Sequence, residues 1–398
     1  MTHTATHVKA HEHELIALRR HLHTQPEPSG EEFLTTELIR DRLLVEGLAP
    51  VVLRSGTGVV CDIPMGLEGG PIVALRADID GLAMDDLTDT PYRSQRPGFA
   101  HACGHDVHIT SVLGAALALL DARENQPRAG TVRLIFEPAE EVVPGGAVDI
   151  IDEGWLDAVW SIYGVHCDPK IDVGRLGLRT GPLTSAADQF EIRLEGPGGH
   201  TARPQVTVDL VRWTARVAAR LWDVMAEQAG QPVTVVFGSV HAGAAANVIP
   251  SSARLTGSFR TPDPATWEHG EKLMRAALDE IMAAPGIGDA PAWTLGYRRG
   301  LPPVVNDAAT TDLVRSAAEH LWGAEAAIST PQSMGGDSFA WYTERIPGTY
   351  VRLGTHDPDS SEARQDLHSA TFNVDERAIA IGAALLAESA LRALDHHS

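Results

Sequence analysis

The stretch Ile109-Thr-Ser-Val-Leu-Gly-Ala-Ala-Leu-Ala-Leu-Leu-Asp-Ala-Arg123, followed by Val132-Arg-Leu-Ile-Phe136, indicates the fold class. The first segment has the length and apolar content of a helix, and the second is a short run of β-branched and aromatic residues typical of a buried strand. Similar short runs lie at Ile72–Leu75 and Val159–Val165. Strands separated by helix-length segments predict an α/β domain with a mostly parallel sheet.

Two helices are predicted before the first of these strands. Leu15, Leu18 and Leu22 recur at three- and four-residue spacing, which is typical of one buried helix face. Ser29 and Glu32 have the form of a capping box, so we expect them to open the second helix.

Residues 185–300 follow a different order of elements. The predicted strand, helix, strand, strand, helix and strand lie at Gln189–Leu194, 210–224, Val233–Val240, Ala253–Arg260, Ala265–Ala283 and Ala292–Tyr297. This β-α-β-β-α-β order is that of a ferredoxin-like α+β domain. We therefore predict that residues 185–300 are inserted into a larger domain of residues 1–184 and 301–398. That domain would resume with a helix at Thr310–Trp322 and end with one beginning at Asp375.

Composition excludes several classes of protein. The chain has 398 residues, of which 43% are hydrophobic and 21% charged, so it can bury a large core in about two domains. The net charge of -21 repels phosphate backbones and anionic lipids, which argues against nucleic-acid and membrane partners. No apolar run reaches the ~18 residues of a membrane span, and the start lacks the apolar core of a secretory signal. We expect a cytoplasmic protein.

The segment His101-Ala-Cys-Gly-His-Asp-Val-His108 carries the densest set of potential metal ligands. It combines three imidazoles, a thiol and a carboxylate just before a predicted helix. Such ligands suit Zn, Co, Mn or Ni, and spacing alone does not choose among these ions. The alternative is a polar helix start with surface histidines. The other two cysteines, Cys61 and Cys167, are interpreted as packing residues, because three scattered cysteines form no disulfide framework.

Further polar candidates follow the other predicted strands. Asp78, the adjacent pair Glu140 and Glu141, and His166 each lie just beyond a predicted strand. The carboxyl edge of an open α/β sheet is where ligands bind, so we expect these side chains to meet there. His368, near the end of the chain, is a further candidate. Taken singly, an acidic pair is usually a solvated surface and a lone histidine is usually a packing residue.

Ordered motifs along nearly the whole chain resemble the M20 family of metallopeptidases and amidohydrolases. The closest branch contains aminoacylases, hippurate hydrolases and auxin-conjugate hydrolases. The matching motifs are LRRHLHTQPEPSGEE (18–32), ALRADIDGL (74–82), HACGHDVH (101–108), FEPAEE (136–141), YGVH (163–166), GPGGHTARP (196–204), ANVIP (246–250), GSFRT (257–261) and LHSATFNVDE (367–376).

The resemblance implies a centre of two divalent metal ions, either Zn, Mn, Co or Ni. Five residues match the family's ligands, namely Cys103, His105, Glu141, His166 and His368. Glu140 is similar to the family's general base, and Asp78 to a carboxylate that orients a ligand. Arg76 stands where other branches have a metal-binding histidine.

Residues around these positions are expected to support them. His101, Asp106 and His108 are predicted to orient the ligands, and an exchange of ligand roles between them and His105 stays open. The chain departs from the family's usual Glu-Asp-Phe at Asp337-Ser338-Phe339, a change that we expect to affect the fit of the substrate.

The resemblance also implies roles for the inserted domain. His200 matches a residue that stabilises the oxyanion, and Asn247 and Arg260 match residues that hold the substrate's carboxylate. The insertion would then act as a lid or dimerisation domain, in a homodimer or higher homo-oligomer.

The predicted activity is hydrolysis of N-acyl-L-amino acids, such as N-acetyl or N-benzoyl compounds, to a carboxylic acid and a free amino acid. A dipeptidase or carboxypeptidase of the same family is the alternative within enzymes. A catalytically silent binding protein and a metal-storage protein are alternatives from other classes.

Overall fold

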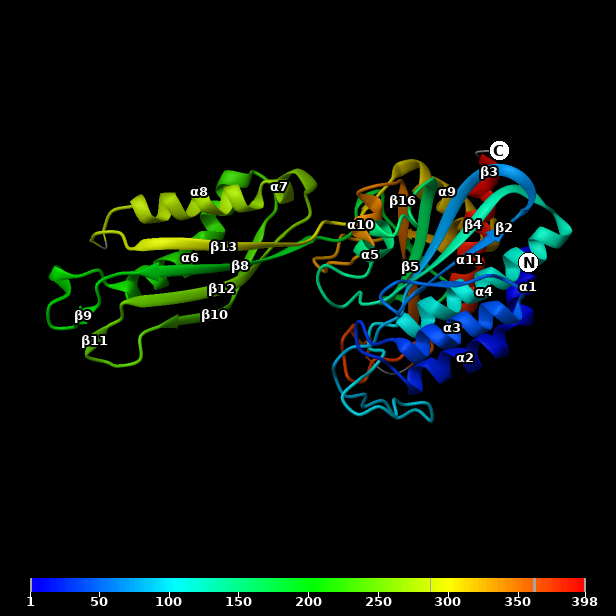
Figure 1. The fold of residues 1–398 in the computed structure, drawn as a ribbon, viewed down its shortest axis with the longest axis horizontal. Coiled ribbons are helices and arrows are strands. Elements are labelled where there is room, and N and C mark those ends of the chain that lie inside the picture. The colour runs from blue at the N-terminus through cyan, green and yellow to red at the C-terminus, as the bar shows by residue number, and fades with distance from the viewer. Residues whose placement is uncertain (1, 287, 361–362, 397–398) are drawn as a thin grey trace. The chain divides into compact units, whose positions relative to one another are not determined.

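The computed structural model describes residues 2–286, 288–360 and 363–396, which fold into two compact units (Figure 1). Of these residues, the first unit comprises 2–183, 305–331, 337–360 and 363–396, and the second comprises 184–286, 288–304 and 332–336. The short segment 332–336 lies outside the predicted insertion at 185–300. It is held to the second unit by backbone bonds, such as the one from the Ser185 amide to the Gly335 carbonyl oxygen (3.0 Å).

The first unit is built on one large sheet with helices around it. Its helices are α1 (His3–Ala10), α2 (Glu12–Thr24), α3 (Phe33–Val45), α4 (His105–Asn125), α5 (Ala147–Asp152), α9 (Ala308–Trp322), η2 (Ala324–Ala326), α10 (Ala340–Thr343) and α11 (Arg377–His396). Its strands are β1 (Val51–Val52), β2 (Val59–Pro64), β3 (Gly66–Asp78), β4 (Arg128–Glu137), β5 (Val159–Asp172), β6 (Leu176–Leu178), β7 (Gly181–Pro182), β14 (Val305–Asn306), β15 (Ala327–Ser329) and β16 (Gly348–His356).

The large sheet is mostly parallel, as predicted. Its strand order is β1-β2-β4-β3-β5-β16-β6-β15, and β4, β3, β5 and β16 are parallel neighbours. Parallel strands covered on both faces are apolar along most of their length. The inner half of β3 and nearly all of β4 and β5 are accordingly buried.

The helices packed around α4 fix the position of its first residue, His105, which is one of the predicted metal ligands. Helices α1, α2 and α11 pack beside α4 (Figure 1). A Cβ atom at Gly114 of α4 would lie 2.8 Å from the Cβ of Ala383 in α11, and one at Gly382 would lie 2.6 Å from the Ser111 Oγ. Small residues therefore let the two helices approach closely. This contact holds α4, with His105 as its first residue, against the sheet.

The second unit has the predicted ferredoxin-like order. It contains β8 (Ala186–Glu195), β9 (Gly199–His200), η1 (Pro204–Val206), α6 (Leu210–Ala229), β10 (Thr234–Ala242), β11 (Val248–Ile249), β12 (Ser252–Thr261), α7 (Pro264–Glu268), α8 (Gly270–Ala283) and β13 (Ala292–Leu301). The four long strands form an antiparallel sheet in the order β10-β12-β8-β13. Helices α6 and α8 share its core, through residues such as Trp213 and Leu278.

Several local predictions were wrong. Three helices (α1, α2 and α3) and not two precede β3, and Asp78 is the last residue of β3 and does not lie beyond it. Ser29 and Glu32 form no capping box, because the Ser29 hydroxyl donates to Asp80 (2.7 Å) and Glu32 accepts from the backbone amides of Gly30 and Ala139. The helix expected at Ala265–Ala283 is interrupted at His269, the C-cap of α7, and restarts at Gly270 in α8.

A further wrong prediction concerns His166. Strand β5 continues past the predicted end at Val165 to Asp172, because β16 pairs with this part of it, Arg352 opposite His166. His166 therefore lies within the strand and not beyond its end.

Replacing Leu255 with alanine should lower the free energy of unfolding by about 2–5 kcal/mol. Leu255 is fully buried in the second unit, opposite Ile192, so truncation removes apolar contact and leaves a cavity. Val236, on β10 of the same sheet, is 52% exposed, and Val236→Ala is the matched control with an expected change below about 0.5 kcal/mol. Denaturant unfolding of both variants checks this, and equal losses would contradict the assigned core.

Candidate metal centre

His105 is held with one ring nitrogen facing the predicted ligands. Its Nδ1 lies 2.9 Å from the Asp80 carbonyl oxygen and 3.1 Å from Asp80 Oδ1. Both oxygens are acceptors, so Nδ1 carries a proton and Nε2 is the nitrogen left to coordinate a cation. That Nε2 lies 3.7 Å from Glu141 Oε1. This arrangement, with a carboxylate or carbonyl behind the imidazole, is the usual support of a metal-binding histidine.

Cys103 and His166 meet on the other side of the cluster. Cys103 Sγ lies 3.5 Å from His166 Nε2, and His166 Nδ1 donates to the Cys167 carbonyl oxygen (2.8 Å). The bond on Nδ1 again leaves the other nitrogen free to coordinate. Gly104, with a φ of +86°, passes directly over β5, and a Cβ there would lie 2.7 Å from the Cys167 sulfur. Glycine is therefore required for the loop to bring Cys103 to this position.

Glu141 joins these residues to His368. Glu141 Oε1 lies 3.4 Å from His368 Nε2, and the Glu141 carboxylate raises the pKa of that imidazole. The ligand atoms of Cys103, Glu141 and His368 lie within 4.8 Å of one another, as do those of His105, Glu140 and Glu141. Four of the five predicted ligands thus lie in two groups of the first unit that share Glu141, and His166 adjoins them through Cys103.

The side chains present fit metal ions. His105 Nε2 and Glu141 Oε1 are buried and have no hydrogen-bond partner among the described residues. Their nearest polar contacts are longer ion pairs, 3.7 Å between the two atoms and 3.4 Å from Glu141 Oε1 to His368 Nε2, so coordination of a cation would give both a closer partner. Burial and the nearby Glu141 carboxylate raise the pKa of the Cys103 thiol well above its ordinary value, so a thiolate there needs a cation. The set of thiolate, imidazole and carboxylate suits Zn²⁺ and related divalent ions.

Asp78 and His108 form a buried hydrogen-bonded pair beside the cluster. His108 Nδ1 lies 2.6 Å from Asp78 Oδ1, and His108 Nε2 accepts the Cys167 backbone amide (2.9 Å). With both ring nitrogens engaged, His108 is not available to exchange roles with His105. Although burial opposes ionisation, His105, Arg76 and His108 hold the pKa of Asp78 well below its ordinary range. Asp78 is therefore a fixed negative charge beside the predicted ligands.

His101 and Asp106 face away from the ligands. Asp106 Oδ2 lies 2.7 Å from both Arg19 Nε and His23 Nδ1, which ties the start of α4 to α2. Neither ring nitrogen of His101 has a hydrogen-bond partner in the described part of the chain, and burial lowers its pKa to about 4. No described hydrogen bond therefore supports the predicted role of these residues in orienting the ligands.

Asp80 is a site residue that the sequence analysis missed. Besides holding His105, it accepts the Glu141 backbone amide at Oδ2 (3.0 Å), so one carboxylate positions two predicted ligands. The signal was present in ALRADIDGL, because Asp78 and Asp80 are two residues apart and side chains at this spacing face the same side of an extended chain.

The three predicted substrate residues lie in the second unit. His200 on β9 pairs with Val248 on β11, directly beside Asn247, whose carbonyl oxygen accepts the Thr201 amide (3.3 Å). His200 Nδ1 accepts the Ala202 amide (3.0 Å), so Nε2 bears the proton and can donate it. Arg260 lies on β12 of the larger sheet, and its Nη1 donates to the Met334 carbonyl oxygen (2.8 Å). Their roles toward a substrate stay predictions.

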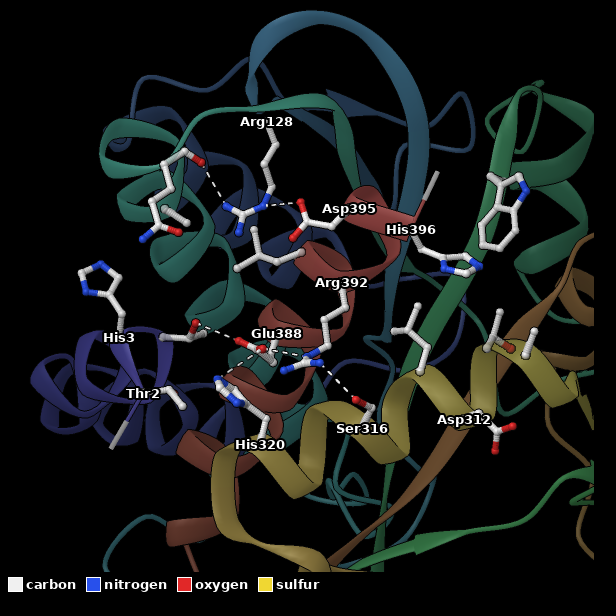
Figure 2. A pocket seen from close by; sticks show the side chains of 18 residues that line it. Thr2, His3, Arg128, Asp312, Ser316, His320, Glu388, Arg392, Asp395 and His396 are labelled. Atoms are coloured by element: carbon white, nitrogen blue, oxygen red, sulfur yellow. Dashed lines mark hydrogen bonds and ion pairs between the residues drawn. The ribbon is translucent and has the colours of Figure 1, made fainter. Parts of the chain in front are cut away.

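A separate cavity of about 900 Å³ in the first unit is a weaker candidate site (Figure 2). It lies by Arg128 and Trp160, at the amino ends of β4 and β5, whereas Asp78 and Glu137 end β3 and β4 at the opposite edge. Ligands of α/β sheets bind at the carboxyl edge. Figure 2 also shows that its arginines are paired, Arg392 with Glu388 and Arg128 with Asp395.

A cluster of a thiol, imidazoles and carboxylates lies at the carboxyl edge of this sheet. Such a cluster is typical of a metal-dependent hydrolase. The sequence pattern of peptidase family M20/M25/M40 matches residues 74–392, and the chain belongs to this family. It is a metal-dependent amide hydrolase with an inserted second domain.

Two relatives and one solved structure illustrate the similarity. An N-acetyl-L-cysteine deacetylase of Bacillus subtilis is 38% identical over 390 residues, covering 96% of this chain and 89% of that protein. A putative glutamate--cysteine ligase 2-3 of Rhodococcus jostii is 43% identical over 373 residues and 93% of this chain. This chain spans only 46% of that relative's length. The Bacillus subtilis YXEP protein, described as a dinuclear metal-binding peptidase of the M20 family, superimposes with a TM-score of 0.85 at 34% identity, over 97% and 99% of the two chains.

No helix in residues 2–286, 288–360 or 363–396 combines the length and apolarity needed to cross a bilayer.

Proposed function

We propose that the chain hydrolyses the amide bond of N-acyl-L-amino acids, giving a carboxylic acid and a free amino acid, with N-acyl-L-cysteines as its preferred substrates. The observation that carries the reaction type is the cluster of Cys103, His105, Glu141, His166 and His368 with Glu140 beside it. The similarity to an N-acetyl-L-cysteine deacetylase supports the choice of cysteine.

The proposed ligands would hold two divalent ions, either Zn, Mn, Co or Ni. When bound, the ions would supply Lewis acidity, which polarises the amide carbonyl and lowers the pKa of water from about 15.7 to about 7. Asp80 and the Cys167 carbonyl oxygen keep the imidazoles of His105 and His166 in the tautomers that coordinate.

Glu140 is the proposed general base. It follows β4 and is 9% exposed, and its carboxylate belongs to the same group of close ligand atoms as His105 and Glu141. It would accept a proton from the attacking water and return it to the nitrogen of the leaving amine. Burial and the carboxylates of Asp337 and Glu141 raise the pKa of Glu140 well above its ordinary value. Positive charge bound at the cluster would oppose this repulsion and favour the ionised base.

The second unit is the proposed lid and dimerisation domain, in a homodimer or higher oligomer. His200 would donate its Nε2 proton to the oxyanion that develops on the amide oxygen. Asn247 and Arg260 would bind the carboxylate of the amino acid, which gives a local positive site in an acidic chain. His200 is exposed on β9, as a side chain that meets a ligand must be. The cytoplasmic location stays a prediction.

The substrate proposal is tested by incubating the metal-loaded chain with N-acetyl-L-cysteine, N-benzoylglycine and a cysteine-containing dipeptide. We expect kcat/KM for N-acetyl-L-cysteine to exceed the others by at least ~10-fold, because a pocket that recognises a side chain discriminates by about 1–3 kcal/mol. N-acetyl-D-cysteine is the control for stereochemistry. Product amines are quantified by mass spectrometry.

Two outcomes would support the alternatives. Faster cleavage of the dipeptide would identify a dipeptidase or carboxypeptidase, in line with the description of the YXEP protein as a peptidase. Absence of hydrolysis with metal bound would support a silent binding protein.

A further inference from the structure

A buried polar cluster adjoins Glu140, and the proposed chemistry uses none of its members except Asp78. Its centre is Arg76, which is 1% exposed. The guanidinium donates to Asp78 Oδ2 (2.6 Å) and Glu137 Oε2 (2.7 Å), and Asp337 Oδ1 lies 3.8 Å away. One cation is thus surrounded by three carboxylates. A buried network of this kind is stable only when every polar atom has a hydrogen-bond partner. Uncharged groups that supply the remaining hydrogen bonds are therefore needed for its stability.

Ser338 is the neutral residue that joins this cluster to Glu140. Its Oγ accepts a hydrogen bond from Arg76 Nη2 (3.0 Å) and donates a short one to Glu137 Oε1. Its backbone amide donates to Glu140 Oε1 (3.2 Å). The residue is fully buried, so water does not substitute for these bonds. Ser338 therefore contacts the Arg76 guanidinium, the Glu137 carboxylate and the proposed base, Glu140.

The segment that carries Glu140 wraps around Ser338. The chain leaves β4 at Glu137, passes Glu140 and returns to the cluster at Ala147, whose amide donates to Glu137 Oε1 (2.9 Å). On the way it crosses Ser338 at Gly145, where a Cβ would lie 2.6 Å from the serine Cβ. Ser338 is thus enclosed by the loop from 137 to 147, and a shift of the serine would move that loop.

We propose that Ser338 is the positioning residue of Glu140. Its hydroxyl fixes the loop from 137 to 147 to the Arg76–Glu137 pair, and its amide fixes the Oε1 oxygen of the base. A backbone donor on one oxygen orients the carboxylate plane and leaves the second oxygen to handle the proton. This inference rests on the proposed role of Glu140. Displacement of a reacting group by about 1 Å can cost ~10²-fold in rate, so loss of the hydroxyl should affect turnover and not binding.

The test is a double-mutant cycle between Ser338 and Glu140, with the chain loaded with metal. Ser338→Ala should lower kcat by about 10-fold, with KM within about 2-fold and metal content unchanged. In the Glu140→Ala background the same change should alter kcat by less than about 2-fold, because residues that act as a unit are not additive. Ser389→Ala is the matched control, since Ser389 is a buried serine on α11 whose hydroxyl has no described partner.

The outcomes separate this inference from the proposed function. Equal effects of Ser338→Ala in both backgrounds would overturn the positioning role and leave the proposed function intact. Normal turnover of Glu140→Ala would remove the base and overturn both. A loss of metal in Ser338→Ala would also overturn the inference, because the serine would then act through the metal ligands. If Ser338→Ala does not fold, Ser338→Cys, which is of similar size and replaces the hydroxyl with a weaker donor, carries the same cycle, with a smaller loss of kcat that should again vanish in the Glu140→Ala background.

Discussion

Glu140→Ala is expected to lower kcat by at least ~10²-fold while the chain keeps its full complement of bound metal. Glu140 is the only proposed proton carrier in the described cluster that is not also a proposed ligand, so truncation removes proton transfer without removing coordination. Steady-state kinetics and elemental analysis of the same sample provide the two measurements.

The control for this variant is Glu124→Ala. Glu124 is a carboxylate near the end of α4 with 73% of its side chain exposed, so its removal should change neither rate nor metal content. Near-normal turnover of Glu140→Ala would show that another group carries the proton. Loss of metal would show that Glu140 is a ligand and that the two adjacent glutamates do not have separate roles.

Cys103→Ala is expected to lower bound metal from about two ions per chain to about one or fewer, and hydrolysis should fall with it. The Cys103 thiol lies close to His166 and also to Glu141 and His368. It therefore links His166 to the other predicted ligands. Alanine offers no ligand atom. Elemental analysis after gel filtration measures the metal content.

Cys61→Ala is the matched control for the cysteine. Cys61 is also buried, in β2 of the same sheet, and it lies among the apolar residues of the core, so it is the thiol expected to serve packing alone. This variant should lose some stability and keep its metal. Unchanged metal content in Cys103→Ala, or loss of metal in Cys61→Ala, would contradict the assigned centre.

Much of the fold could be predicted because the spacing of apolar residues along the chain directly indicates which segments form helices and which form strands. The run from Ile109 to Arg123 and the short strands around it predicted the parallel sheet, and the order of elements from 185 to 300 predicted the ferredoxin-like unit. The break in the helix at His269 was not predicted. Gly270, where α8 begins, packs so closely on the sheet that a Cβ there would lie 2.5 Å from the Tyr297 hydroxyl and 2.8 Å from the Phe259 ring, and local sequence does not show such contacts.

The capping box shows how a local signal can be overridden by distant residues. Ser29 and Glu32 satisfy the spacing, but Asp80 and the Ala139 amide offer them partners that are far away in the sequence. Similarly, the end of β5 was misplaced because its extension depends on pairing with β16. The structural preference of a short segment contains no information about partners that are distant in the sequence.

The sequence by itself determined the residue types of the candidate metal centre, their order along the chain and the family's fold. Only the tertiary structure decided which nitrogen of His105 and of His166 is left to coordinate, and that both nitrogens of His108 are engaged, by Asp78 and the Cys167 amide. It also decided that Asp80 and Ser338 contact the proposed ligands and the proposed base. The physical reason is that hydrogen-bond direction and burial arise from contacts between segments dozens to hundreds of residues apart, whereas ligand chemistry belongs to each side chain alone.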